Sequence, residues 1–237
     1  VGSINQTSGI QNLDQDRYFN ESAPFPTEHE QTAIATFLDR ETAKIDGLIA
    51  EQEKLITLLA EKRQATISHA VTKGLNPDAP MKDSGAEWLG AVPEGWECFP
   101  VKRLFRMVVE PAPDGNDEEL LSIYTDIGVR PRKSLEAKGN KATTTDGYWR
   151  VKKGDIIVNK LLAWMGAIGL SDYDGVTSPA YDILRGVKPL HPKFFDYLFR
   201  CGIMFTEFRR YSRGIMDMRL RLYFEELGQI IAPFPSL

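Results

Sequence analysis

The sequence predicts a mixed α/β domain preceded by one long α-helix that forms a coiled coil. Residues 27–73 have the pattern of a single helix, and residues after 101 alternate between short strand-like and helical stretches. With 42% hydrophobic and 26% charged residues, the 237-residue chain can bury an ordinary core. Its net charge of −4 gives no overall indication of a nucleic-acid partner.

The long helix is predicted to begin at Thr27 and to end near Lys73. Thr27 is suited to be the N-cap, and acidic residues follow in the first turn, where the helix dipole favours them. Gly74 and Pro77 supply stop signals at the other end. Because no proline lies between these limits, we expect a continuous helix about 70 Å long.

Apolar residues recur along this helix at a spacing of about 3.5, which is typical of a coiled-coil seam. So narrow a stripe needs a partner helix, and no second segment of the sequence has the same pattern. We therefore expect the partner to come from another chain or from a part of the protein outside this sequence. The predicted seam residues are Ile34, Leu38, Ile45, Leu48, Leu55 and Leu59.

The remaining residues divide into a connector and a domain. Residues 74–100 are rich in proline, glycine and tryptophan, and we interpret them as the connector. Residues 101–237 form the predicted α/β domain, with one amphipathic helix over Pro192–Tyr211. Strands are predicted at Leu120–Tyr124, Gly147–Val151 and Asp155–Val158.

A short internal repeat links the two ends of the sequence. Its elements are Gly-Ile, an apolar residue, Tyr-Phe and Pro-Phe-Pro, found over residues 9–26 and again over 214–235. We interpret residues 1–26 as the tail of a preceding domain of the same kind, in a parent protein of two domain–helix modules. The start without methionine also indicates a fragment or a processed form. Chance similarity between short aromatic segments is the alternative.

Several ordered motifs resemble one known family, the specificity subunits of type I restriction–modification systems. The resemblance covers nearly the whole chain. The residues that carry it are the connector 77–90 with Pro93 and Trp96, Glu30-Gln31 and Phe37–Ile49 of the long helix, and Lys153–Ile157, Ser178–Tyr181 and Gly214-Ile215 of the domain.

The resemblance implies a cytoplasmic, non-catalytic protein that binds double-stranded DNA. In that family each of two recognition domains reads half of a split site, and two antiparallel helices hold the domains apart and dock methyltransferase subunits. S-adenosylmethionine, ATP and Mg are then expected only in the partner subunits, with cleavage in a restriction subunit. Only one recognition domain is complete here, so recognition of both half-sites by this chain alone is not expected. The solitary helix is a candidate for pairing in a homodimer.

The basic residues are concentrated in two segments. Residues 128–160 hold nine Lys and Arg against three acids, and residues 198–223 hold six Arg against two acids. The acids are concentrated elsewhere, notably in 114–119, so both segments are candidates for binding phosphates, although a solvated face is the alternative. The candidate DNA-binding residues are Lys138, Lys141, Lys160, Trp164, Ser178, Tyr181, Arg213, Arg219 and Arg221.

Some of these candidates also have a purely structural interpretation. Lys138 and Lys141 stand in a polar segment that fits an ordinary surface loop equally well. Trp164 is a lone aromatic in an apolar stretch, which is typical of a core residue. Ser178 and Tyr181 bound a segment that fits a tight turn.

Two catalytic interpretations are weak. Ser178-Pro179-Ala180-Tyr181 is similar to the motif with which amino-methyltransferases hold a target amine, but alanine replaces the second proline and no glycine-rich loop follows a strand. Asp126, Glu136 and Lys138 fit a metal-dependent nuclease pattern only loosely. No phosphate-binding loop of an ATP-driven motor is found in the sequence.

The remaining composition favours a cytosolic protein. Cys98 and Cys201 are far apart, and the three histidines are too scattered to indicate zinc. No apolar run approaches the roughly 20 residues that span a bilayer, and no signal peptide opens the sequence. A coiled-coil scaffold or oligomerisation protein with a protein-binding α/β domain is the other functional class that fits, and salt dependence of binding separates it from a DNA-binding protein.

Overall fold

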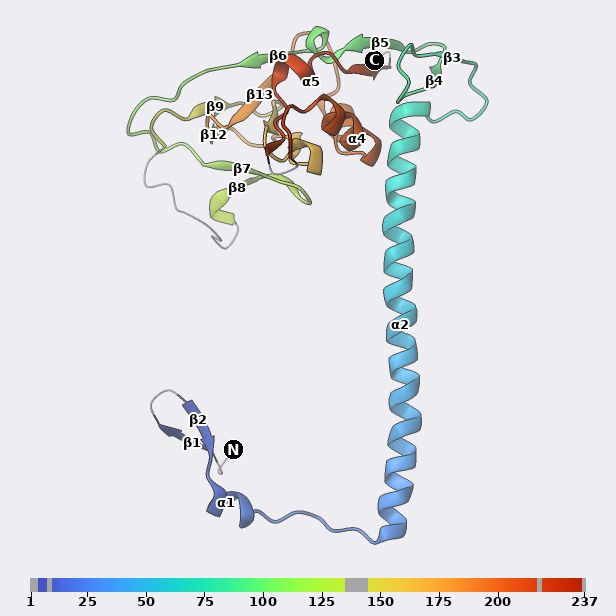
Figure 1. Cartoon of the computed structure of the whole chain (residues 1–237), viewed down its shortest axis with the longest axis vertical. Helices are drawn as coiled ribbons and strands as arrows, with labels where there is room; N and C mark the ends of the chain where they lie inside the picture. Colours follow the sequence, from blue (N-terminus) through green and yellow to red (C-terminus); the bar gives the residue numbers. More distant parts are fainter. Residues whose placement is uncertain (1–3, 8–9, 135–144, 217–218, 236–237) are drawn as a thin grey trace. The chain divides into compact units, whose positions relative to one another are not determined.

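The computed structural model describes residues 4–7, 10–134, 145–216 and 219–235 (Figure 1). The chain divides into two compact units, Val1–Leu58 and Leu59–Leu237, and each is described separately. The division into 1–26, 27–73, 74–100 and 101–237 that the sequence indicates stays a prediction.

The first unit begins with a hairpin and a short helix. Strands β1 (Ile4–Thr7) and β2 (Ile10–Leu13) pair antiparallel, and α1 (Gln15–Phe19) follows. The Tyr18, Phe19 and Phe25 side chains are 53%, 73% and 94% exposed, so the aromatic residues of the first repeat copy have little packing within this unit.

Helix α2 (Glu28–Lys73) is continuous over 46 residues, as predicted. Its start is a capping box, because the backbone N–H of Glu30 donates to Thr27 Oγ1 over 3.3 Å while the Thr27 backbone N–H donates to the Glu30 carboxylate over 3.0 Å. Hydrogen bonds from Thr27 hold the pKa of Glu30 below its ordinary value. The Thr27 N-cap prediction is therefore confirmed.

The predicted seam of α2 lies on the surface. Its side chains are roughly half exposed, from 47% at Leu55 to 60% at Leu48. Near its C-terminal end the same helix joins the core of the second unit, where Val71 and Thr72 are buried. Pairing of the seam with another helix stays a prediction.

The second unit is built on a four-stranded antiparallel sheet with the order β11-β10-β13-β6. Its two central strands are largely buried, and all four residues of β10 are inaccessible to solvent or nearly so. The strands are β6 (Phe105–Val108), β10 (Ile156–Asn159), β11 (Ile168–Leu170) and β13 (Tyr181–Gly186).

Smaller two-stranded sheets surround this sheet. The pairs are β3 (Met81–Asp83) with β4 (Ala91–Pro93), β5 (Glu97–Pro100) with β14 (Ile231–Phe234), β7 (Leu121–Tyr124) with β8 (Gly128–Pro131), and β9 (Trp149–Val151) with β12 (Gly175–Thr177). The three predicted strands correspond to β7, β9 and β10. Short 3-10 helices occupy Val101–Arg103 (η1), Arg132–Ser134 (η2) and Ala163–Met165 (η3).

Two helices, α3 (Pro192–Phe199) and α4 (Gly202–Tyr211), supply the aromatic part of the core. Phe195 packs edge-on against Phe105 with ring centroids 5.1 Å apart, and Phe199 lies 6.2 Å from Phe208. All four rings are at most 1% exposed, so this cluster fixes the sheet to both helices.

The prediction of one helix over Pro192–Tyr211 is wrong, because the chain breaks between α3 and α4. Cys201 has extended backbone angles (φ −82°, ψ 146°), and Gly202 follows it. The break lets Arg200 turn its guanidinium into the domain, where it donates to the carbonyls of Ile168 (3.1 Å) and Asp126 (2.8 Å). These tertiary hydrogen bonds outweigh the local helical periodicity.

The connector folds as part of the second unit. Its strand β5 pairs with β14, and Trp96 packs edge-on against Phe194 at 6.0 Å. The last strand β14 is followed by Pro235, and helix α5 (Phe224–Leu227) precedes it. Among the described residues, no helix combines the length and apolarity needed to cross a membrane.

Candidate nucleic-acid interface

Folding places glutamates beside three bases of the first basic segment, residues 128–160. Glu118 pairs with Arg150 at 2.6 Å, Glu119 with Lys133 at 3.5 Å, and Lys152 with Glu110 at 3.5 Å, although Glu110 also pairs with Arg185 at 2.6 Å. The acids of 114–119 are remote from these bases in the sequence but adjacent to them in space. Separation of acids and bases in the sequence therefore does not leave the bases of the described part of this segment unpaired in the fold.

The Lys160 side chain is mostly buried, at 18% exposed. Its Nζ donates to Asp182 Oδ1 over 2.9 Å and to the Pro179 carbonyl over 3.3 Å, and it lies 5.9 Å from the Trp149 ring centre. Burial raises the pKa of Asp182 above its ordinary value, and the hydrogen bond from Lys160 opposes that rise. The ammonium of Lys160, which follows β10, therefore links the end of β10 to β13 through Asp182.

Ser178 and Tyr181 bound a tight turn, the structural alternative for this segment. The Tyr181 N–H donates to the Ser178 carbonyl over 3.0 Å, and the Ala180 N–H donates to Ser178 Oγ over 3.3 Å. The Tyr181 ring is half-buried, and burial raises the pKa of its phenol. Both side chains are therefore held in place by the domain, and their contact with DNA stays a prediction.

Trp164 has the core packing that was its structural interpretation, and its contact with DNA stays a prediction. Its ring packs against the main core cluster, and its Nε1 donates to the Leu161 carbonyl over 3.1 Å. The Arg209 guanidinium lies over the same ring, 5.1 Å from its centre. Arg209 thus belongs to the candidate site although sequence reasoning did not single it out, since nothing local connects it to a residue 45 positions earlier.

The second basic segment contains an antiparallel bridge between Arg213 and Arg221, and we call its described residues, 213–216 and 219–221, the hairpin. The N–H groups of Arg213 and Arg221 each donate to the other residue's carbonyl over 2.9 Å, and the Arg219 N–H donates to the Met216 carbonyl over 2.8 Å. Gly214 has φ +147°, and a Cβ there would lie 2.6 Å from the Arg219 carbonyl oxygen. Only glycine at 214 allows the backbone to approach Arg219 this closely.

The base of the hairpin is anchored in the domain. The Leu222 N–H donates to the Lys160 carbonyl over 2.9 Å, and Leu220 and Leu222 are 8% and 0% exposed. Arg213 pairs with Glu226 of α5, whose carboxylate is buried while most of the arginine remains exposed. The described residues of the loop are thus fixed at its base, and Ile215 and Met216 beyond it are exposed.

The end of α4 and the hairpin together form a surface that we call the arginine surface. Glu207 and Glu226, the acids that pair with its arginines, are both buried beneath it. Arg209, Arg210, Arg213 and Arg219 are exposed and Arg221 is half-buried, so positive charge dominates the outer layer. The arginine surface consists of Arg209, Arg210, Arg213, Arg219 and Arg221.

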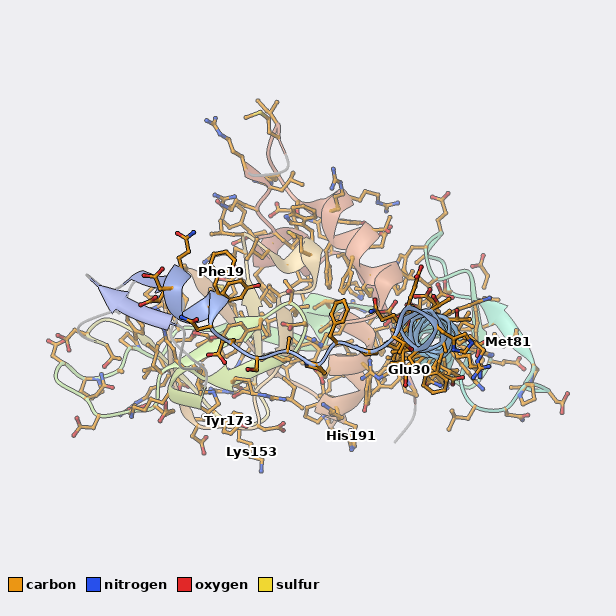
Figure 2. All side chains as sticks on the ribbon, turned by 90° about the horizontal axis from the view of Figure 1, so that it is seen from below. Phe19, Glu30, Met81, Lys153, Tyr173 and His191 are labelled. Atoms are coloured by element: carbon orange, nitrogen blue, oxygen red, sulfur yellow. The ribbon has the colours of Figure 1, made fainter. Side chains whose placement is uncertain are left out.

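Figure 2 shows the side chains of the segment after α4 extending away from the rest of the second unit, whereas Lys153 points outward on another side. Lys138, Lys141 and Glu136 lie outside the described residues. Asp126, the remaining member of the nuclease pattern, is exposed in the turn between β7 and β8. In the part of the chain that the structure describes, no three His, Cys, Asp or Glu side chains are grouped to hold a metal ion.

Comparison with solved structures supports the expected fold. A chain from a structure that describes complex assembly and conformational transition of the type I restriction–modification system matches 98% of this chain with a TM-score of 0.61 and 15% identity. The HsdS subunit from Thermoanaerobacter tengcongensis matches 98% of this chain with a TM-score of 0.50 and 16% identity. No protein-family model and no curated protein matches the sequence.

The fold that the motif resemblance implied, a long helix with a mixed α/β domain, is therefore confirmed. The chain spans about half the length of the solved chains that it matches, 53% in each case.

Proposed function

We propose that this chain is a sequence-specific DNA-binding specificity subunit, or a fragment of one, that reads one half of a bipartite site. The observation that carries the proposal is the arginine surface on a domain with the HsdS fold. Its arginines lie on the end of α4 and on a hairpin whose base is hydrogen-bonded to the domain, which favours contact with base edges and phosphates at defined positions. Catalysis, S-adenosylmethionine, ATP and Mg then belong to methyltransferase and restriction subunits.

The charge distribution along α2 supports antiparallel pairing of the seam. Residues 28–53 hold seven acids against two bases, a net charge of −5, whereas residues 54–73 hold four bases against one acid, a net charge of +3. In an antiparallel pair of two copies, the acidic half of each helix faces the basic half of the other, whereas a parallel pair places like charges together. We therefore propose that α2 pairs antiparallel, with a second copy when no other spacer helix is present.

The DNA-binding proposal is tested by selecting from a random duplex library at several salt concentrations, with and without a methyltransferase subunit. We expect a short enriched motif and an affinity that falls steeply with salt, because each neutralised phosphate releases counterions. No enrichment under any condition, together with binding to protein partners that salt leaves unchanged, would favour a scaffold protein instead. The scaffold alternative is supported by the exposed apolar seam, because such a seam is a surface for binding another protein.

The pairing proposal is tested by the mass of the chain in solution. Leu48→Lys places a charge in the seam, so we expect it to convert a dimer into a monomer in sedimentation equilibrium. Ala50→Lys is the matched control, since residue 50 lies on the other side of the helix. A monomeric mass for the unaltered chain would contradict pairing with a second copy.

A further inference from the structure

The tip of the hairpin carries two apolar side chains that are exposed to solvent. Ile215 is 101% exposed and Met216 is 54% exposed. A single exposed aliphatic residue needs no explanation by itself. Here, however, two backbone hydrogen bonds join Arg213 to Arg221, and glycine at 214 permits the close approach to Arg219. The base of the loop, which carries Ile215, is therefore held by the backbone.

The surroundings of the tip favour nucleic acid over protein as its partner. Residues 209–221 contain five arginines and one acid, Asp217. Arg213 and Arg219, on the two sides of the tip, are both exposed. An apolar protein surface would gain from Ile215 but would have to desolvate these charges, whereas a DNA groove accepts the charges on its phosphates and the apolar group against its bases.

We propose that Ile215, with Met216 beside it, is an apolar wedge that inserts against the stacked bases of the DNA held by the arginine surface. The inference rests on the DNA-binding function proposed above and uses only residues 213–216 and 219–221. Aliphatic side chains inserted at a base step partly unstack it, and the energy of unstacking depends on the sequence of the step. The wedge therefore adds to sequence selectivity without requiring a hydrogen bond.

The test compares Ile215→Ala with the unaltered chain on two probes, the duplex enriched in the library selection and a mixed random-sequence duplex. We expect Ile215→Ala to weaken binding of the enriched duplex about tenfold and binding of the random duplex less than about twofold, since phosphate contacts dominate non-specific affinity. Leu75→Ala is the matched control, because Leu75 is also an almost fully exposed aliphatic residue, at 90%. It should leave both affinities unchanged.

A second measurement reports unstacking directly. 2-Aminopurine is placed at one position at a time along the enriched duplex. Its fluorescence should increase at one base step when the unaltered chain binds, and Ile215→Ala should abolish that increase. Ile215→Leu should retain it, since the wedge needs bulk rather than a particular branch.

The outcomes separate the two proposals. If the chain binds DNA but Ile215→Ala changes neither affinity nor fluorescence, the wedge is wrong and the DNA-binding function stands. A loss of methyltransferase binding in Ile215→Ala, with DNA binding intact, would identify the tip as a protein contact and also overturn the wedge. If the unaltered chain binds neither duplex, both proposals are wrong.

Discussion

Residues 128–160 and residues 198–223 both show a large excess of basic side chains in the sequence, but folding places the two segments in different electrostatic surroundings. In the first, Arg150, Lys133 and Lys152 each pair with a glutamate, and Lys160 pairs with the buried Asp182. In the second, the paired glutamates are buried and the five arginines of residues 209–221 lie at or near the surface, whereas Arg200 turns into the domain.

The difference shows that the net charge of a segment is a poor guide to its surface potential. Acids from another part of the chain can neutralise one face, whereas acids buried beneath arginines leave the outer layer positive. Of the two segments, the second is therefore the better candidate for contact with DNA. Variants that remove one basic side chain at a time can test that distinction.

The largest effect is expected from Lys160→Met, which leaves Asp182 without its partner. The Asp182 side chain is only 5% exposed, so the variant should lose about 3 kcal/mol of unfolding free energy, as expected when one member of a buried ion pair is removed. Urea unfolding at pH 7 measures the loss. Lys153→Met is the control, since Lys153 is exposed, and it should cost little. Equal stability of the two variants would contradict a structural role for Lys160.

The stability loss of Lys160→Met should also depend on pH. Burial raises the pKa of Asp182, and loss of Lys160 removes the hydrogen bond that opposes the rise. A carboxyl group with a higher pKa in the folded state than in the unfolded state binds protons more readily when folded, so lowering the pH favours folding. The deficit of Lys160→Met relative to the unaltered chain should therefore shrink as the pH falls from 7 towards 5. A deficit that grows in that range would contradict the assignment.

The next largest effect is expected from Arg200→Lys, a change within the second basic segment. The guanidinium donates to carbonyls of both the β7–β8 turn and the segment around β11, and one ammonium cannot reach all of them. We expect a loss of about 2 kcal/mol in unfolding free energy and unchanged DNA affinity. Weaker DNA binding at unchanged stability would instead place Arg200 in the interface.

Contacts between residues close in the sequence could be predicted, whereas the long-range contacts of Lys160 and Arg200 could not. The start of α2 follows from Thr27 and Glu30, which are three residues apart, and its end follows from Gly74, so local chemistry was enough to predict them. The Lys160–Asp182 pair spans 22 residues and the Arg150–Glu118 pair spans 32, and no spacing rule predicts such contacts. The helix break at Cys201 was missed for the same reason, because tertiary hydrogen bonds of Arg200 decide it.

A smaller effect, this time on binding, is expected from Arg219→Ala. Arg219 is exposed on the hairpin, so its loss should leave the unfolding free energy almost unchanged. Affinity for the enriched duplex should fall about tenfold, and the slope of log affinity against log salt should decrease by about one if the side chain binds a phosphate. Fluorescence anisotropy at a series of salt concentrations measures both. An unchanged slope with lost selectivity would indicate a base contact instead.

The smallest effect is expected from Arg150→Ala, the counterpart of Arg219→Ala in the first segment. Arg150 pairs with Glu118, but the two side chains are 46% and 28% exposed, and pairs of this kind contribute roughly 0.5 kcal/mol. Because Glu118 already offsets its charge, DNA affinity should change by less than about twofold. The variant Glu118→Gln sharpens the test, since it frees the arginine and should raise non-specific DNA affinity at low salt. If Arg150→Ala weakens DNA binding as much as Arg219→Ala does, the contrast between the two segments fails, and the interface must extend over both.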